Sequence, residues 1–381
     1  MMIDLDLTLD EFRADYFEQK PRHFPGALKE RPIAWSDLDQ VLHTIDPREP
    51  AMRMFHHGQL LENVYVEEFS EAGQPRYRLN RAKFHEYMDN GATLQINWLE
   101  RHLVTAKRLC QEIGRYAATA TSGNAYMSFS GDGSFGEHWD THDVFVIQLI
   151  GRKHWRIFPP TFKLPLALQK NDRSGHTCPT EPAIEMIVEE GDVIYLPRGW
   201  WHHVIPLQVG SFHLAVGCYA PSLFDYIVQT SAKFLELQLD ARRAFSPTNY
   251  RDAVTKLMQQ LPAVLLDPES AAAFELDTAS RERMDAEFTL AALDSAAAPL
   301  SGDALLSLAT FRSPALEDGL LLVNGAQLRL EPVNQAIVAT LRDTKSLKLD
   351  ALCARLVDVP ADAVLHAVLE LAHYDIITIQ Q

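Results

Sequence analysis

The sequence has 381 residues, 47% of them hydrophobic, and its formal net charge at pH 7 is -16. This length predicts two or three folding units with a substantial core. The acidic balance argues against nucleic-acid binding as the main activity and favours a basic partner. The four cysteines lack the spacing of a zinc site or a disulfide framework, no apolar run could span a membrane, and the first residues lack a signal-peptide pattern. We therefore expect a cytoplasmic protein that does not insert into a membrane.

The first 120 residues predict helices with a few strands between them. Thr8 and Glu11 have the spacing of a capping box and begin the first helix. A second helix is predicted from Trp35 to Leu42, and a strand from Thr93 to Ile96. The amphipathic stretch from Trp98 to Ile113 predicts a helix whose apolar side packs on the following domain.

Between residues 125 and 220 the sequence changes to short strands separated by turn residues, as an all-β barrel requires. The predicted strands are Ala125 to Ser130, Asp143 to Ile150, His154 to Phe158, Ile184 to Glu189, Asp192 to Leu196 and Phe212 to Tyr219.

A candidate metal site lies within this strand region. Residues i and i+2 of an extended strand point to the same face, so His138 and Asp140 can offer an imidazole and a carboxylate to one metal ion. His202 follows a predicted strand and a Pro-x-Gly turn and can supply a third ligand. Two histidines and one carboxylate that leave coordination positions open are typical of non-haem iron(II) oxygenases. His203 is the alternative third ligand, because neighbours on an extended segment face opposite ways and only one of the two histidines can reach the metal.

A His-x-Asp triplet alone is weak evidence, because a chain with fifteen histidines should contain about one by chance. The context makes this triplet specific: a glycine-rich turn precedes His138, an apolar run follows Asp140, and a cation stands at Lys153. This context disfavours the alternative in which His138 and Asp140 are only a hydrogen-bonded surface pair.

Three segments together resemble the JmjC-type 2-oxoglutarate and iron(II) dependent oxygenases: His-Trp-Asp at 138–140, the Gln-x-x-Gly-x-Lys segment that ends at Lys153, and Pro-Arg-Gly-Trp-Trp-His, which ends at His202. Within that family the sequence is most similar to the bacterial ribosomal oxygenases, which hydroxylate an arginine of a large-subunit ribosomal protein. The resemblance implies a double-stranded β-helix (cupin, jelly-roll) core that holds Fe(II) with His138, Asp140 and His202.

The resemblance also implies that the basic residue at position 153 binds the distal carboxylate of 2-oxoglutarate. Lys153 stands where the bacterial ribosomal enzymes carry arginine, so the charge is kept but the bidentate geometry is lost. Ser128 matches a serine that lines the co-substrate pocket in that family. A cationic substrate would need acidic groups near the mouth of the barrel, and Asp132, Glu137 and Asp143 are the candidates.

After Pro221 the sequence becomes helical, with predicted breaks at Pro247, Pro262 and Pro268 and a linker at 295–299. The apolar stripes of these helices need a partner surface; the resemblance implies a dimerisation region, while the chemistry alone also permits a lid. Residues 301–381 predict strands and helices in a winged-helix-like order. Their six basic and ten acidic side chains give a net charge of -4, so we expect a protein-contact or structural module that does not bind DNA directly.

We therefore predict an α+β chain of three parts: a JmjC/cupin catalytic domain at 1–221, a helical dimerisation region at 222–300 and a winged-helix-like domain at 301–381. The resemblance implies a homodimeric protein hydroxylase that uses Fe(II) and 2-oxoglutarate and acts on a large-subunit ribosomal protein, with an arginine side chain as the first candidate target. A ribosomal protein histidine hydroxylase and a lysine demethylase are alternatives with the same core. Alternatives of other classes are a ligand-sensing regulator, which the acidic tail disfavours, and a cupin enzyme without 2-oxoglutarate, in which Lys153 would have no function.

Overall fold

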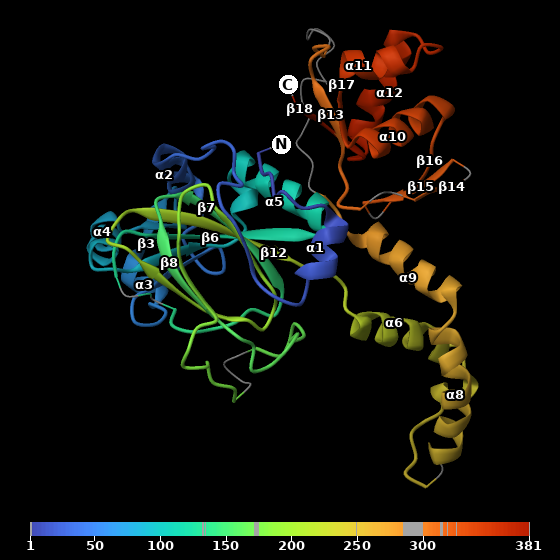
Figure 1. Ribbon diagram of the computed structural model, residues 1–381, viewed down its shortest axis with the longest axis horizontal. Coiled ribbons are helices and arrows are strands. Elements are labelled where there is room, and N and C mark those ends of the chain that lie inside the picture. The colour runs from blue at the N-terminus through green and yellow to red at the C-terminus, as the bar shows by residue number, and fades with distance from the viewer. Residues whose placement is uncertain are drawn as a thin grey trace. The chain divides into compact units, whose positions relative to one another are not determined.

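The computed structural model forms two compact units, Met1–Tyr219 and Ala220–Gln381 (Figure 1). The residues it describes are 2–131, 133, 135–170, 175–248, 250–284, 300–312, 315–317, 319–324 and 326–380. Both units contain helices and strands, which confirms the predicted α+β class. The predicted division into three domains stays a prediction.

Two antiparallel sheets form the centre of the first unit. The large sheet has the order β1-β10-β7-β12-β6-β5-β2, and the small sheet has the order β11-β8-β9. The strands of the large sheet are β1 (Arg22–Phe24), β10 (Val193–Leu196), β7 (Asp143–Ile150), β12 (Ser211–Cys218), β6 (Thr121–Ser128), β5 (Thr93–Ile96) and β2 (Met52–Phe55). Those of the small sheet are β11 (Trp201–Pro206), β8 (Lys153–Phe158) and β9 (Ile184–Val188).

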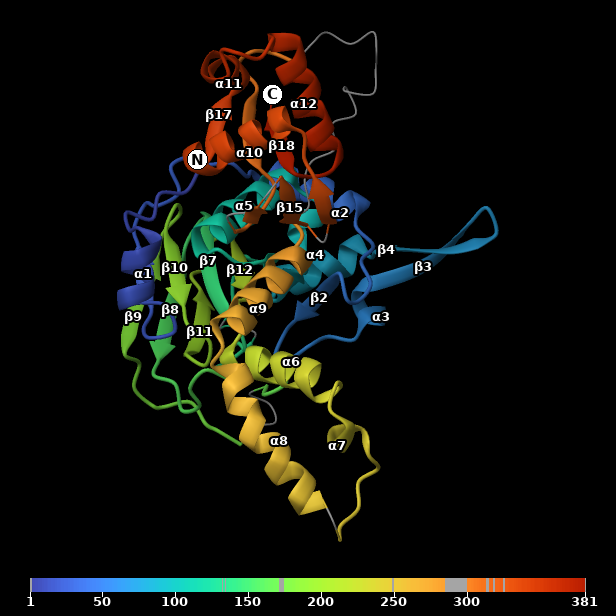
Figure 2. The same cartoon turned by 90° about the vertical axis from the view of Figure 1, so that its right-hand side faces the viewer.

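Strand β7 shows how the two sheets share one interior. Its side chains at 144 and 146 pack with Trp155 and Ile157 of β8, so these residues lie between the sheets. Its side chains at 145, 147 and 149 belong to a separate apolar cluster on the opposite face. A strand that is buried on both faces reads as a continuous apolar run, as Val144 to Ile150 does. Figure 2 shows β8, β9 and β11 alongside β7, β10 and β12.

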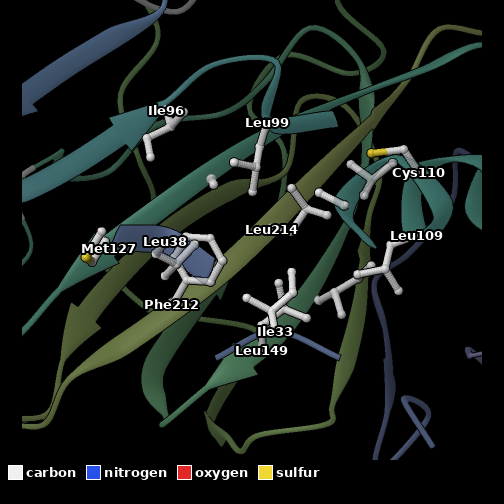
Figure 3. Packing of buried hydrophobic residues seen from close by; sticks show 14 of the residues in the cluster. Ile33, Leu38, Ile96, Leu99, Leu109, Cys110, Met127, Leu149, Phe212 and Leu214 are labelled. Carbon is white, nitrogen blue, oxygen red and sulfur yellow. The ribbon is translucent and has the colours of Figure 1, made fainter. Parts of the chain in front are cut away.

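Helices cover the outer face of the large sheet. They are α1 (Leu9–Asp15), α2 (Trp35–Thr44), α3 (Glu62–Tyr65), α4 (Arg81–Asp89), η1 (Leu99–Arg101) and α5 (Val104–Ala117). Figure 3 shows Leu38 of α2 and Leu109 of α5 among Leu149, Phe212 and Leu214 of the sheet. This cluster packs the helices against the outer face of the large sheet. The inner face of the large sheet faces the small sheet. A separate hairpin is formed by β3 (Val66–Glu71) and β4 (Gln74–Leu79).

Most predicted elements of the first unit are present, with two differences. The Thr8–Glu11 capping box is confirmed, but the helix predicted from Trp98 begins only at Val104. Trp98 has a φ of 55°, in the left-handed region, and separates η1 from the strand before it. Strand β11 was not predicted, because Pro197 and Gly199 indicated a turn just before it.

The second unit begins with helices α6 (Leu223–Leu235), α7 (Leu239–Arg242), α8 (Tyr250–Leu265) and α9 (Pro268–Arg281). The predicted break at Pro262 is wrong, because Pro262 lies inside α8. Proline removes one backbone hydrogen bond, and a helix can continue past that loss. Pro268 is the first residue of α9, capped by Asp267. The linker predicted at 295–299 lies outside the described residues.

The rest of the second unit contains two three-stranded sheets, β17-β13-β18 and β14-β15-β16. A core of its own includes Leu306, Leu321, Ile337 and Leu371. The strands are β13 (Leu305–Leu308), β14 (Ala315–Glu317), β15 (Leu320–Val323), β16 (Ala326–Arg329), β17 (Ser346–Lys348) and β18 (Ile377–Gln380); the helices are α10 (Pro332–Thr344), α11 (Leu349–Arg355) and α12 (Ala361–His373). None of the helices in the described ranges is both long and apolar enough to cross a bilayer.

Candidate metal centre

A cavity opens between the two sheets of the first unit. All three predicted metal ligands line it, and so does Lys153. Other lining side chains are Tyr126, Trp155 and His213, with apolar residues such as Val146 and Leu196. The cavity therefore combines a group of metal-binding side chains with one cation inside an apolar barrel.

The predicted ligands His138, Asp140 and His202 lie together, with one ligand atom of each within 4.8 Å of the others. Two backbone hydrogen bonds between the histidines hold this arrangement: His138 N donates to His202 O at 3.2 Å, and His202 N donates to His138 O at 2.8 Å. Among the described residues, this is the one group of three or more such side chains that is close enough to hold an ion.

Both histidines are oriented by backbone carbonyls. Nδ1 of His138 is 3.2 Å from Gly136 O, and Nδ1 of His202 is 3.2 Å from Trp200 O. A ring nitrogen next to a carbonyl oxygen carries the proton and donates it, which leaves Nε2 as the ligand atom. This is the orientation that a metal-binding imidazole needs.

The charges at the site also fit a metal ion. Burial lowers the pKa of His202 to about 4, so its imidazole is neutral at pH 7. Burial alone would raise the pKa of Asp140, but the neighbouring His202, His142 and His138 outweigh it and hold that pKa below its usual value. Two imidazoles and one carboxylate are the donor set that suits Fe(II) and leaves open positions.

His203, the alternative third ligand, does not join this group. It lies beside Glu137, with 3.5 Å between His203 Nδ1 and Glu137 Oε1. Because β11 is extended, the side chain of His202 enters the barrel and that of His203 leaves it.

Lys153 lies deep in the barrel and is only 2% exposed. Its Nζ is 3.2 Å from His213 Nδ1. Burial lowers the pKa of Lys153 to about 7, far below its usual value of 10.5. An anionic ligand would stabilise the charged form of this buried amine, because the ligand supplies the counter-charge that the apolar barrel lacks.

Ser128 lies outside the lining of the cavity. Its hydroxyl is 3.2 Å from that of Ser211, and both side chains are fully buried. The two serines are paired across β6 and β12, two residues along from the Tyr126–His213 pair. A role for Ser128 in binding a co-substrate stays a prediction.

The three acidic candidates for substrate binding have different surroundings. Asp143 is buried and accepts hydrogen bonds from Tyr195 Oη at 3.0 Å and from Arg198 N at 3.1 Å, so it supports the fold. Burial raises the pKa of Asp143 to about 6. Glu137 is half-exposed next to His138. Asp132 lies outside the described residues.

Sequence reasoning missed three polar residues of the cavity. Trp155 is two residues beyond Lys153 on β8, so strand alternation was a signal that could have found it. Tyr126 and His213 come from β6 and β12, and only the pairing of these strands brings them to Lys153.

Comparison with known proteins agrees with this geometry. The JmjC domain family matches residues 98–226, which include the three metal ligands and Lys153. The chain therefore contains a JmjC domain, and its donor set is the one that a 2-oxoglutarate-dependent oxygenase of this type uses.

Over its whole length the chain has the fold of the Escherichia coli ribosomal oxygenase YcfD, with a TM-score of 0.60, 17% identity and 100% coverage of both chains. A structure of YcfD in complex with cobalt and 2-oxoglutarate matches with a TM-score of 0.58, 16% identity and the same coverage.

Two curated relatives are similar in sequence. Ribosomal oxygenase 1 of Gallus gallus is 26% identical over 241 residues, which are 61% of this chain and 38% of the relative. The bifunctional lysine-specific demethylase and histidyl-hydroxylase NO66 of Drosophila persimilis is 24% identical over 234 residues, 58% of this chain and 32% of the relative. The chain thus spans about a third of the length of these relatives.

Metal binding should distinguish the two neighbouring histidines. We expect His202→Ala to weaken cobalt(II) binding by more than about 100-fold, because it removes a ligand from a set of three. His203→Ala should bind cobalt as the unaltered chain does. Visible absorption of cobalt(II) measures both, and equal binding by His202→Ala would show that the third ligand is another residue.

The free energy of unfolding should depend on pH because the amine of Lys153 is buried. Between pH 7 and 10.5 the unfolded chain binds more protons at position 153 than the folded chain does, so the free energy of unfolding should rise with pH. The contribution is up to about 1.4 kcal/mol per pH unit. Lys153→Met should remove this slope, and exposed Lys170→Met should retain it. Urea unfolding at several pH values measures this, and equal slopes for both variants would contradict it.

Proposed function

We propose that the chain is a 2-oxoglutarate and Fe(II) dependent protein hydroxylase that acts in the cytoplasm on an arginine side chain of a large-subunit ribosomal protein. One observation carries the proposal: a two-histidine, one-carboxylate group and a single buried cation line the same closed barrel. This arrangement suits a ligand that binds the metal with one end and carries a carboxylate at the other. The names of the relatives support the ribosomal substrate.

Each residue of the cavity has a definite task in this proposal. His138, Asp140 and His202 would hold the iron, and Lys153 would bind the distal carboxylate of the co-substrate. Iron(II) with 2-oxoglutarate supplies, when bound, the oxidation of a substrate C–H bond by oxygen. The apolar lining, which includes Val146 and Leu196, excludes water from that reaction.

The charge of the protein suits a basic substrate. The net charge of -16 attracts a cationic ribosomal protein over a distance. Glu137 is half-exposed and its carboxylate lies beside His203, outside the barrel, where a cationic side chain of the substrate protein can meet it. Glu137 is therefore our candidate for contacting the basic substrate.

A ribosomal histidine hydroxylase is the second candidate. Relatives named as histidyl-hydroxylases reach 35% identity, over 112 residues, whereas the YcfD structures share 17% or less. Lysine at position 153 also differs from the arginine that the resemblance to bacterial ribosomal oxygenases implies. The same relatives carry the name lysine-specific demethylase, which keeps that activity as a third possibility to test.

Mass spectrometry of modified ribosomal proteins tests this function. Large-subunit proteins incubated with the enzyme, iron(II) and 2-oxoglutarate should gain one oxygen atom on a single protein, and His138→Ala should give none. Fragmentation then distinguishes arginine from histidine. Turnover of 2-oxoglutarate without any gain would overturn the ribosomal substrate, and loss of methyl groups would indicate a demethylase.

We also propose that helices α6 and α8 bind a second copy of the chain, and that residues 301–381 form a winged-helix-like, protein-contact module without direct nucleic-acid binding. Several large apolar side chains on these helices are exposed, among them Leu223, Phe224 and Val228 on α6 and Met258 on α8. Apolar exposure on consecutive turns of a helix is typical of an interface.

Sedimentation experiments should show the proposed dimer. Phe224→Asp should shift the chain toward monomers, because it places a charge in an apolar interface. Leu168→Asp, at an exposed apolar position in the first unit, is the control and should leave the dimer intact. A monomeric unaltered chain would contradict the proposal.

A further inference from the structure

His213 is held on three sides at the inner end of the cavity. Its ring stacks on Tyr126, with 5.0 Å between ring centroids and 19° between planes. Trp155 meets it edge-on at 5.7 Å. On the third side, Nδ1 is 3.2 Å from Lys153 Nζ. The imidazole is 5% exposed, so these contacts leave it little freedom to turn.

These contacts decide which nitrogen of His213 carries the proton. A lysine ammonium group only donates hydrogen bonds, so His213 Nδ1 accepts from Lys153 Nζ. Burial, with the charge of Lys153 second, lowers the pKa of His213 well below its usual value, so the ring is neutral. A neutral ring that accepts at Nδ1 carries its proton at Nε2 and presents it as a donor.

Trp155 adds a second neutral donor. Its side chain is 2% exposed and lines the cavity, yet within the described part of the chain its indole Nε1 has no hydrogen-bond partner. Buried indole N–H groups nearly always have a partner. The ring lies between the metal ligand His202, at 6.0 Å, and His213. An unpartnered donor here indicates that a ligand in the cavity supplies the acceptor.

We propose that His213 and Trp155 complete the carboxylate-binding end of this cavity. His213 acts as a positioning residue that orients the ammonium group of Lys153, and Trp155 donates its indole N–H directly to the ligand. The ligand class is a 2-oxo dicarboxylate. This inference rests on the proposed co-substrate and adds two residues to its site.

The proposal has a specific consequence for ligand selection. The ammonium group of Lys153, oriented by His213, and the indole N–H of Trp155 together match a single carboxylate group. A 2-oxo acid of the same length that ends in a methyl group offers these donors no acceptor. His213 and Trp155 should therefore affect the binding of 2-oxoglutarate and leave the binding of 2-oxopentanoate unchanged.

The test measures binding of both acids to the cobalt-loaded full-length chain, through the visible absorption of cobalt(II). His213→Phe keeps a ring to stack on Tyr126 but removes both nitrogens, and Trp155→Phe keeps a ring but removes the N–H. Each should raise the Kd for 2-oxoglutarate about tenfold or more, as the loss of a hydrogen bond to a charged group does. The Kd for 2-oxopentanoate and the affinity for cobalt should stay within about twofold of the unaltered chain.

Two further variants separate positioning from structural support. His213→Asn should restore most of the affinity, because its amide oxygen can take the place of Nδ1 and accept from Lys153. Ser122→Ala, on β6 but outside the cavity lining, is the control and should bind both acids normally. If His213→Phe does not fold, His213→Asn and Trp155→Phe carry the test.

Three outcomes would overturn the inference. Unchanged 2-oxoglutarate binding in the His213 and Trp155 variants would show that Lys153 acts without them. Equal losses for both acids would indicate a structural role only. Failure of the unaltered chain to bind 2-oxoglutarate, with cobalt bound, would instead overturn the proposed co-substrate and this inference with it.

Discussion

The site depends on one backbone contact, the pair of hydrogen bonds between His138 and His202. His138 precedes the large sheet at β7, and His202 belongs to β11 of the small sheet. The contact joins the two sheets at one end of the barrel and brings both imidazoles to the same place. Asp140 lies two residues after His138 and before β7 begins, and Gly199 N donates to Asp140 O at 3.0 Å, which helps to hold it there. The metal centre is therefore a product of barrel closure.

The buried Lys153 lowers the stability of the folded chain and at the same time provides a charge that can bind a ligand. A lysine in an apolar interior disfavours the folded state while it is charged, and its pKa falls in response. The protein tolerates this cost because the outer cluster on α2, α5 and the large sheet holds the barrel independently of the cavity. Functional sites commonly keep such destabilising groups where a ligand later compensates them.

The two units differ in where their charged and apolar side chains lie. The first unit buries Lys153 in its cavity and leaves carboxylates such as that of Glu137 exposed to solvent. The second has its own core in residues 300–379 but leaves apolar side chains of α6 and α8 exposed. A surface of this kind is unfavourable in water unless another surface covers it, which is why contact with a second chain is the natural expectation for these helices.

The sequence alone predicted pairs of residues that lie two positions apart in the chain and act together. Alternation placed His138 and Asp140 on one face, and the turn before His202 predicted a third ligand. The same argument reaches Trp155 from Lys153. Tertiary structure decided the rest: β6 and β12 bring Tyr126 and His213 to Lys153, and Tyr195 and Arg198 enclose Asp143. Strand periodicity gives the face on which a side chain lies, but the pairing of distant strands decides what that face meets.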